Sequence, residues 1–253
     1  MFLLSSPLEQ FQIFSVCSFW ISSFDFSISN STFIIVITLF WFFNFILLIN
    51  SNDFNFFFIP SRFQFFIEFS YEVVLKMVVD SIGSKYQKLF PIVFCIFLFI
   101  LISNIIGLIP FSFTLSSNLI ITFSLSLSIF FSINIICFFK HGINFFSLFL
   151  PSGSSLLLSF ILIPIEIISY IFRPISLSVR LFANMMAGHT LLKVIVGFSW
   201  SMIFGSGSIF LFHLFPLFIL VGLIGLELAV ACIQSYVFTI LFCIYLKDSL
   251  FLH

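Results

Sequence analysis

Charged residues are scarce in this chain. Of its 253 residues, nine are Lys or Arg, nine are Asp or Glu, and 62% are hydrophobic, including 45 Phe. Water-soluble domains carry about 25% charged residues, whereas this chain has 7%. The composition therefore excludes that class and indicates a polytopic membrane protein. The balance of charge also excludes nucleic acid as a partner, because phosphate binding requires clustered Lys and Arg.

Several other signals are missing. The five cysteines form no Cys-x-x-Cys pair and are interpreted as small buried hydrophobic residues. The four histidines are too dispersed for a di-iron or haem enzyme, so we expect neither a cofactor nor a metal site. The chain shows no internal repeat, which disfavours a secondary transporter. Residues 1–25 contain no Lys or Arg, so we expect neither an import presequence nor a signal peptide there.

Long hydrophobic runs are present and predict the fold. They cover residues 32–49, 89–109, 118–139, 156–172 and onward, and 209–246, against the roughly 20 residues needed to cross the hydrocarbon core. We therefore expect an all-α polytopic membrane protein with five membrane helices. Its predicted parts are an N-terminal segment (1–31), the first membrane helix (32–50), a surface segment (51–88), a membrane hairpin (89–139) and a long helical hairpin (140–253).

The surface segment contains a predicted amphipathic helix. Between residues 60 and 88, apolar residues recur at three- and four-residue steps among charged ones, a pattern typical of a helix lying on the membrane. Four of the nine basic residues fall there. The positive-inside rule therefore places this segment on the cytoplasm-equivalent face and the N-terminus on the opposite side. Alternation of the helices then puts Lys140 and Lys247 on the inner face as well.

The last two hydrophobic segments are too long for ordinary membrane helices. Residues 154–200 and 209–246 would each extend about 60 Å, twice the hydrocarbon thickness. They are predicted to form a steeply tilted and kinked hairpin, and Pro164, Pro174 and Pro216 supply kink sites. The alternative is two short spans in each segment, but neither segment has a polar turn between its halves.

Arg180 is the main anomaly in the first of these segments. A guanidinium keeps its proton at physiological pH and costs several kcal/mol inside a membrane, so such a residue is a functional candidate by default. Glu166, Arg173 and Asn184 lie on the same stripe of the helix at 100° per residue, so this face must meet protein or water. The alternatives are an arginine that snorkels to the headgroups and plain helix packing, which explains the small residues around Arg180 but not its charge.

A second polar stripe runs along the last segment. Glu227, Gln234 and Tyr245 are seven and eleven residues apart, which places a carboxylate, an amide and a phenol on one helical face that can pass protons or hold water. His189 lies about 180° from Arg180 on its own helix and should point toward Glu227. The alternative for Glu227 is a neutral structural carboxyl group, and the other members could each be packing residues.

Taken with the topology, these residues predict a proton path. Glu166 lies toward the inner end of its helix, Arg180 near the middle, and His189 about 13 Å further outward. Glu227 also lies toward the outside. Polar groups are therefore predicted on each side of the membrane centre, with Arg180 between them. This order indicates two offset half-channels separated by a fixed positive charge, and no continuous pore.

The same residues carry a family resemblance. Residues 177–189 and 226–246 are similar to subunit a of the F-type ATP synthases, as are the motifs Asn104-x-x-Gly-x-x-Pro110 and His141-Gly142. The N-terminal run Ser6-Pro-Leu-Glu-Gln-Phe11 is similar to the mitochondrially encoded forms of plants and protists. The pairing of a histidine at 189 with an acid at 227 also resembles the mitochondrial version.

The resemblance implies a role for each site residue. Arg180 would face a rotating ring of c subunits, while Glu227 and His189 would belong to a half-channel open to the intermembrane space. Glu166 would belong to the matrix half-channel. The residues that would support the path are Asn184, Gln234 and Tyr245.

The resemblance also implies a setting. The chain would be a non-catalytic, proton-translocating stator subunit in the mitochondrial inner membrane, with its N-terminus in the intermembrane space and its C-terminus in the matrix. Its partners would be the c-subunit ring, the peripheral stalk, other membrane-sector subunits and lipids, within a large hetero-oligomer. The alternative function is an antiporter-like proton-translocating subunit of a respiratory complex. Such subunits usually show intramembrane lysines in repeated halves, and here Lys193 is the only candidate.

Overall fold

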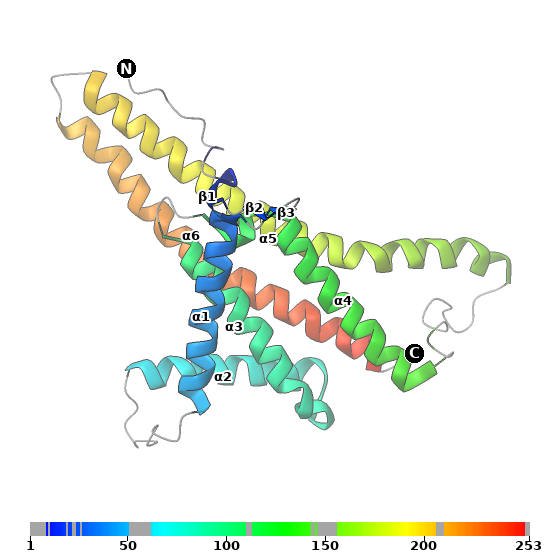
Figure 1. Ribbon diagram of the computed structural model, residues 1–253. Helices are drawn as coiled ribbons and strands as arrows, with labels where there is room; N and C mark the ends of the chain where they lie inside the picture. The colour runs from blue at the N-terminus through cyan, green and yellow to red at the C-terminus, as the bar shows by residue number, and fades with distance from the viewer. Residues whose placement is uncertain are drawn as a thin grey trace. The chain divides into compact units, whose positions relative to one another are not determined.

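Membrane helices make up most of the fold. The computed structural model describes residues 9, 11–18, 20–21, 24–25, 27–50, 62–109, 113–142, 145, 156–205 and 210–250. In these residues the chain forms the helices α1 (Asn30–Asn50), α2 (Arg62–Ser81), α3 (Phe90–Gly107), α4 (Leu119–His141), α5 (Leu156–Gly205) and α6 (Phe210–Leu250) (Figure 1). Its shorter elements are the 3-10 helices η2 (Ser84–Leu89) and η3 (Leu115–Ser117) and the strands β1 (Ser15–Cys17), β2 (Trp20–Ile21), β3 (Phe24–Asp25) and β4 (Ile28–Ser29). Five described helices are long and apolar enough to cross a membrane, which confirms the predicted all-α polytopic class.

α5 and α6 are single long helices. They contain 50 and 41 residues, and each continues through its internal prolines, Pro164 and Pro174 in α5 and Pro216 in α6. A proline removes one backbone hydrogen bond, but the flanking apolar residues still favour a helix where no water competes for the backbone. The alternative of two short spans in each segment was therefore wrong.

The amphipathic helix is shorter than predicted. α2 ends at Ser81, and the chain continues as η2 instead of remaining in one helix through residue 88. The break lies at Gly83, whose φ of 96° is in the left-handed region that favours glycine. The apolar periodicity carries on across the break, so the pattern of side chains could not locate it.

α2 has one buried and one exposed face. Val74, Met77 and Val78 are buried, and the Met77 sulfur accepts a hydrogen bond from the Thr239 hydroxyl of α6 at 3.8 Å. Phe65 and Phe69 are exposed, with their rings stacked 6.4 Å apart. The helix therefore packs against α6 with one face, while its opposite face carries exposed aromatic rings.

An exposed ion pair links successive turns of α2. Lys76 Nζ lies 2.8 Å from Glu72 Oε1. Their hydrogen bond, and then their opposite charges, hold the pKa of Glu72 below its ordinary value and the pKa of Lys76 above its own. Pairs spaced four residues apart support a helix locally.

Two short antiparallel strand pairs precede α1, and the sequence did not predict them. β1 pairs with β4, and β2 pairs with β3. The Asn30 side chain joins this segment to the start of α1, because it accepts a hydrogen bond from Phe14 N at 3.3 Å and donates one to Gln12 O at 3.0 Å. Strands of two or three residues are too short to show an alternating pattern.

The chain folds into two compact units. Unit 1 contains Met1–Ser51, Phe99–Leu119 and Leu181–Gln234, and unit 2 contains Asn52–Leu98, Ile120–Arg180 and Ser235–His253. α5 and α6 therefore each contribute to both units. Within unit 1, the C-terminal part of α5 and the N-terminal part of α6 run antiparallel and side by side (Figure 1). The buried residues include Leu101, Leu181 and Met185 in unit 1 and Val93, Phe238 and Phe242 in unit 2.

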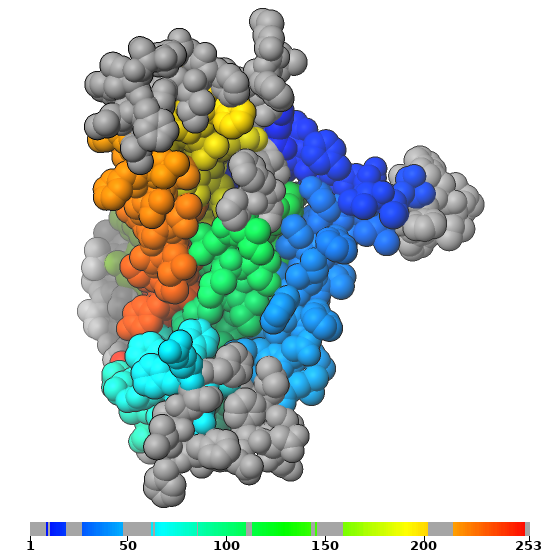
Figure 2. Space-filling model, turned by 90° about the vertical axis from the view of Figure 1, so that its left-hand side faces the viewer, coloured from blue at the N-terminus to red at the C-terminus, as the bar shows by residue number. Residues whose placement is uncertain are grey.

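Apolar side chains also cover the outside of the helices. Only 6% of the membrane-spanning part of α1, Asn30–Leu47, is buried, and Phe33, Phe40 and Trp41 are among its exposed residues. The space-filling view shows the bulky side chains of α1 (blue) uncovered on this face (Figure 2). Exposed apolar surface of this extent is compatible with acyl chains and not with water.

The cysteines only partly match their prediction as buried residues. Cys137 and Cys243 are buried, whereas Cys17 and Cys232 are exposed. For Cys232, in the middle of α6, the reason is that lipid accepts a small apolar side chain as readily as a protein core does. Apolar character in the sequence therefore does not report burial within the protein.

Candidate functional site

A carboxyl group and an imidazole meet inside unit 1. Glu227 on α6 and His189 on α5 are each 5% exposed, and Glu227 Oε1 lies 3.8 Å from His189 Nδ1. From its position around the helix, about 180° from Arg180, His189 was predicted to point toward Glu227. The structure confirms this contact. At 3.8 Å the groups are too far apart for a direct hydrogen bond, but a small movement of either side chain would bring them within hydrogen-bond distance. The pair can therefore accept and release a proton.

Gly188 allows this approach. A Cβ atom at Gly188 would lie 3.0 Å from Glu227 Cγ and 3.1 Å from Glu227 Cδ, and it would overlap the Oε1 atom. Any side chain at this position would push the Glu227 carboxyl group away from His189. At this turn α5 thus presents bare backbone to the Glu227 side chain of α6, as small residues permit in membrane helices.

An amide pair lies further along the same two helices. Asn184 Nδ2 donates a hydrogen bond to Gln234 Oε1 at 2.9 Å. Gln234 is 4% exposed, whereas Asn184 is exposed. The antiparallel order of α5 and α6 brings Asn184 to Gln234 and His189 to Glu227, so four of the predicted site residues come together in unit 1.

Unit 1 also contains polar groups that the sequence did not assign to the site. Asn104 on α3 is fully buried and donates through Nδ2 to the carbonyl oxygen of Ala231 at 3.4 Å. Ala231 lies about one helical turn from Glu227 on α6. The Oδ1 atom of Asn104 and the hydroxyl groups of Thr114 and Ser116 are buried without a hydrogen-bond partner among the described residues.

These unsatisfied groups give unit 1 a capacity to bind water. Buried polar atoms in proteins almost always have a partner, either protein or ordered water. Glu227 Oε1 and His189 Nε2 share this unsatisfied state within the described part of the chain. The only signal for Asn104 in the sequence was its place in the Asn-x-x-Gly-x-x-Pro motif, which supported the resemblance and not a site.

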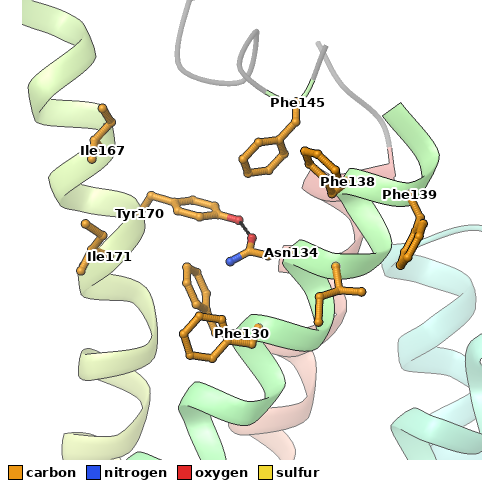
Figure 3. A pocket seen from close by; sticks show the side chains of 10 residues that line it. Phe130, Asn134, Phe138, Phe139, Phe145, Ile167, Tyr170 and Ile171 are labelled. Atoms are coloured by element: carbon orange, nitrogen blue, oxygen red, sulfur yellow. Dashed lines mark hydrogen bonds between the residues drawn. The ribbon is translucent and has the colours of Figure 1, made fainter. Parts of the chain in front are cut away.

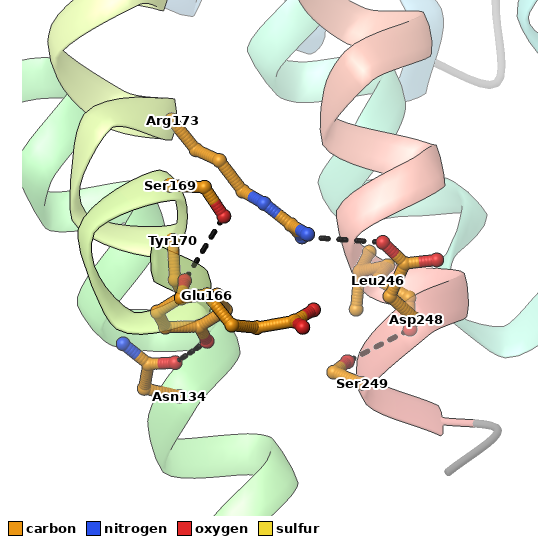
Figure 4. Close-up of polar contacts among 8 residues, drawn as sticks. All are labelled: Asn134, Glu166, Ser169, Tyr170, Arg173, Leu246, Asp248 and Ser249. Atoms are coloured by element: carbon orange, nitrogen blue, oxygen red, sulfur yellow. Dashed lines mark hydrogen bonds and ion pairs between the residues drawn. The ribbon is translucent and has the colours of Figure 1, made fainter. Parts of the chain in front are cut away.

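A second charged site joins α5 and α6 in unit 2. Arg173 Nη1 lies 3.2 Å from Asp248 Oδ2 (Figure 4). The guanidinium carbon also lies 5.2 Å from the ring centroid of Tyr170 and 5.1 Å from that of Tyr245, within the range of a cation–π contact. Arg173 is therefore neutralised within the chain. Asp248, its partner, was not predicted as a site residue.

Tyr245 belongs to this second site and not to the Glu227 pair. It shares a helical face with Gln234, but eleven residues of helix, about 16 Å, separate them. A common face therefore does not make a common site.

Figure 4 shows the Glu166 carboxylate turned toward α6, beside Arg173. No described residue forms a hydrogen bond or an ion pair with that carboxylate.

Arg180 differs from Arg173 because it has no counter-charge in the described chain. Its side chain is exposed, and no described residue forms a hydrogen bond or an ion pair with its guanidinium. The exposed neighbours on this face of α5 are small or polar, namely Ser176, Ala183, Asn184 and Ala187. A face of this kind can receive a closely packed helix.

Two charged pairs therefore join α5 and α6 in the described chain. His189 has Glu227 as its neighbour, and Arg173 has Asp248. In the part of the chain that the structure describes, no group of three or more His, Cys, Asp or Glu side chains could hold a metal ion.

Known proteins are similar to this chain along nearly its whole length. The model of the family described as ATP synthase A chain matches residues 31–247. The ATP synthase subunit a of Pylaiella littoralis is 50% identical over 249 residues, which cover 98% of this chain and 99% of that protein. The protein of the same name from Marchantia polymorpha is 45% identical over 251 residues, covering 98% and 99%. That of Allorhizobium ampelinum is 41% identical over 250 residues, covering 97% of each.

Proposed function

This chain belongs to the ATP synthase A chain family, and on that premise we propose that it forms the proton path of the membrane sector of the F-type ATP synthase. It acts as one subunit of a multisubunit complex. In the proposed mechanism, two offset half-channels deliver protons to, and remove them from, the carboxylates of a rotating c-ring. Arg180 separates the two half-channels. The antiporter-like alternative has no support from this family.

The observation that carries the proposal is the contrast between two arginines of α5. Arg173 lies 3.2 Å from Asp248, whereas Arg180 is exposed and has no ion pair with a described residue. A permanent cation in a membrane span requires a counter-charge or water. A carboxylate on a moving ring would provide that charge when deprotonated and would leave Arg180 when protonated, because only the neutral form enters lipid readily.

Unit 1 would supply the half-channel that opens to the intermembrane space. Glu227 and His189 form its proton-exchanging pair. Asn104 is bonded to Ala231, about one turn from Glu227, and its unsatisfied Oδ1 atom can hold a water. The hydrogen bond between Asn184 and Gln234 orients two amides on the same pair of helices. Ionisable and hydrogen-bonding groups in this order can pass protons along a file of water.

Unit 2 would supply the matrix half-channel. Its proposed proton carrier is Glu166, whose carboxylate points toward α6 and has no described partner (Figure 4). Arg173 lies about two turns from Glu166 on α5 and contacts Tyr245 and Asp248 of α6. In the sequence of α5, Arg180 falls between Glu166 and His189, so a proton passing directly between the half-channels would meet a fixed cation.

The proposed setting is the mitochondrial inner membrane, with the N-terminus in the intermembrane space and the C-terminus in the matrix. The c-ring is the moving partner, and the peripheral stalk and other membrane-sector subunits hold the chain still. Each proton that crosses is driven by about 2.3 kcal/mol per 100 mV of membrane potential. The chain itself would make no contact with ATP, so its role is non-catalytic.

The test is the removal of the charge at Arg180. We expect Arg180→Ala to abolish ATP synthesis in membrane vesicles driven by an imposed proton gradient, because the ring carboxylate loses its counter-charge and the barrier between the half-channels is lost. Val179→Ala is the control, since Val179 is the adjacent residue and is 44% exposed. Normal synthesis by the Arg180→Ala complex would refute the proposal.

A further inference from the structure

We propose that Tyr170 is a positioning residue of the matrix half-channel. Its hydroxyl is anchored to Asn134 of α4. Its ring holds the Arg173 guanidinium next to Asp248 and therefore away from Glu166. This inference rests on the proposed function, in which Glu166 carries protons and must remain without a fixed counter-charge. All five residues belong to unit 2.

The anchor of Tyr170 is a hydrogen bond to a different helix. The Tyr170 hydroxyl of α5 donates to Asn134 Oδ1 of α4 (Figure 3), and the Phe130 ring of α4 lies 5.0 Å from the Tyr170 ring. The other residues that line this groove are apolar, including Phe138 and Ile171. Where no water competes, such a bond is stronger than at a polar surface. α4 therefore holds Tyr170 by both its hydroxyl group and its ring.

Tyr170 passes this restraint to the cation beside it. Tyr170 and Arg173 are three residues apart on α5, so their side chains are neighbours on the helix surface. The guanidinium carbon lies 5.2 Å from the centroid of the Tyr170 ring. From α6, the Tyr245 ring lies 5.1 Å from the same carbon, and Asp248 provides the counter-charge at 3.2 Å. The guanidinium is thus held by one aromatic ring from each helix and by one carboxylate.

A second carboxylate lies within reach of the same guanidinium. Glu166 is seven residues from Arg173, about two turns along the same face of α5, and Figure 4 shows both side chains extending toward α6. No described residue pairs with the Glu166 carboxylate. If Arg173 left Asp248, it could pair with Glu166 and hold that carboxylate in its ionised form. The position of Arg173 therefore decides whether Glu166 can carry protons.

Chemical modification of Glu166 in the intact ATP synthase complex tests this role. Dicyclohexylcarbodiimide enters membranes and reacts with protonated carboxyl groups. Glu166 is the only acidic residue of α5, so mass spectrometry of the α5 peptides assigns its product directly. We expect modification of Glu166 in the unchanged protein. Tyr170→Leu removes the ring and the hydroxyl, and modification should fall at least about tenfold, because a charge-assisted hydrogen bond from Arg173 would keep the carboxylate ionised.

The dependence on Arg173 separates positioning from plain packing. In the Arg173→Gln/Asp248→Asn background both charges are absent, so adding Tyr170→Leu should not lower the modification of Glu166 further. Phe172→Leu is the matched control. It makes the same exchange of an aromatic ring for a leucine on α5, at a residue that is 58% exposed and lies about 160° from Tyr170 around the helix. We expect this control to leave the modification unchanged.

Two milder variants test the anchor alone. Tyr170→Phe removes only the hydroxyl group, and Asn134→Leu removes only its acceptor. Each should lower the modification of Glu166 about threefold through the loss of one hydrogen bond. The two together should lower it no more than either alone, since both remove the same bond. Because the ring of residue 170 is kept, these variants provide the test if Tyr170→Leu prevents assembly of the complex.

Three results would overturn the proposal. The first is unchanged modification of Glu166 in both Tyr170 variants. The second is a fall of the same size in the Phe172→Leu control or in the background without Arg173, which would mean that Tyr170 only packs the helices. The third is no modification in the unchanged protein, because the proposal requires a carboxyl group that is free to take up a proton.

The proposed function is tested separately from this inference. Normal proton flux through a Glu166→Gln complex would remove Glu166 from the matrix half-channel. The modification experiment does not measure flux, so its result would still show whether Tyr170 controls the position of Arg173.

Discussion

At position 188, the lack of a side chain determines whether the Glu227 carboxyl group can reach His189. We expect Gly188→Ala to displace Glu227 and to slow proton conduction, since the added Cβ would lie 3.0 Å from Glu227 Cγ. Overpacking of a tight site typically destabilises a protein by about 1–3 kcal/mol. Proton uptake by vesicles that contain the assembled complex, under an imposed potential, measures the effect.

Gly222→Ala is the matched control for this substitution. It makes the same change on α6, where a Cβ atom would meet nothing within 4 Å. We expect this variant to conduct protons normally. Equal loss in both variants would show that the effect comes from helix backbone changes and not from contact with Glu227.

Glu227 itself can be changed almost without altering its shape. Glu227→Gln keeps the volume of the side chain but cannot ionise, so we expect proton flux to fall about a hundredfold if the residue transfers protons. Leu228→Gln is the control, because Leu228 is the adjacent residue and is 52% exposed. An unchanged flux through the Glu227→Gln complex would remove this carboxyl group from the proton path.

The sequence could predict the contact of a single side chain only where its angular position on one helix was enough to show which way it points. His189 was predicted to face Glu227 from its angle on α5 alone, and the structure confirmed the contact. Asp248 was missed, because its importance depends on which helix lies next to it and on the 3.2 Å contact with Arg173. Asn104 was missed as a site residue for the same reason, since α3 is distant from α6 in sequence.

At the scale of an element, α2 shows how one glycine divides a continuous apolar pattern. Gly83 has a φ of 96° and open space around its Cα atom. Gly83→Ala should therefore cost about 1–3 kcal/mol through backbone strain alone and lower the temperature at which the assembled complex loses activity. ATP synthesis well below that temperature should be unchanged, because α2 lies outside the proposed path.

Ser84→Ala provides the control for this element. It alters the exposed residue next to Gly83 without requiring a left-handed backbone. We expect the same thermal midpoint as in the unchanged protein. If Gly83→Ala also left the midpoint unchanged, the break between α2 and η2 would not depend on glycine.

Elements were predictable in proportion to their length. The membrane helices were found because hydrophobic runs of about 20 residues have few alternatives in lipid. β1 to β4 were not found, because their pairing depends on contacts between residues such as Ser15 and Ser29 and not on a local pattern. The end of α2 was misplaced because the sequence shows the spacing of apolar side chains but not the φ of Gly83.

At the scale of the whole molecule, the face of α5 that carries Arg180 should lie against the c-ring. Ala183 and Ala187 are exposed beside Arg180, so cysteines placed there should form disulfide cross-links with cysteines near the ring carboxylate. Ile171→Cys is the control, because Ile171 is 53% exposed but lies about 180° from Arg180 around the helix. Cross-links from Ile171 and none from Ala183 or Ala187 would contradict the proposed orientation.

The pairing of α5 with α6 in unit 1 has a consequence for how this protein can vary. Asn184 contacts Gln234, and His189 contacts Glu227. The two pairs are thus five residues apart on α5 and seven residues apart on α6. One residue inserted between Asn184 and His189 would turn the imidazole by about 100° and shift it by about 1.5 Å. Exchange of one apolar side chain for another leaves both pairs in place. Between these pairs, the number of residues is therefore constrained far more tightly than their identity.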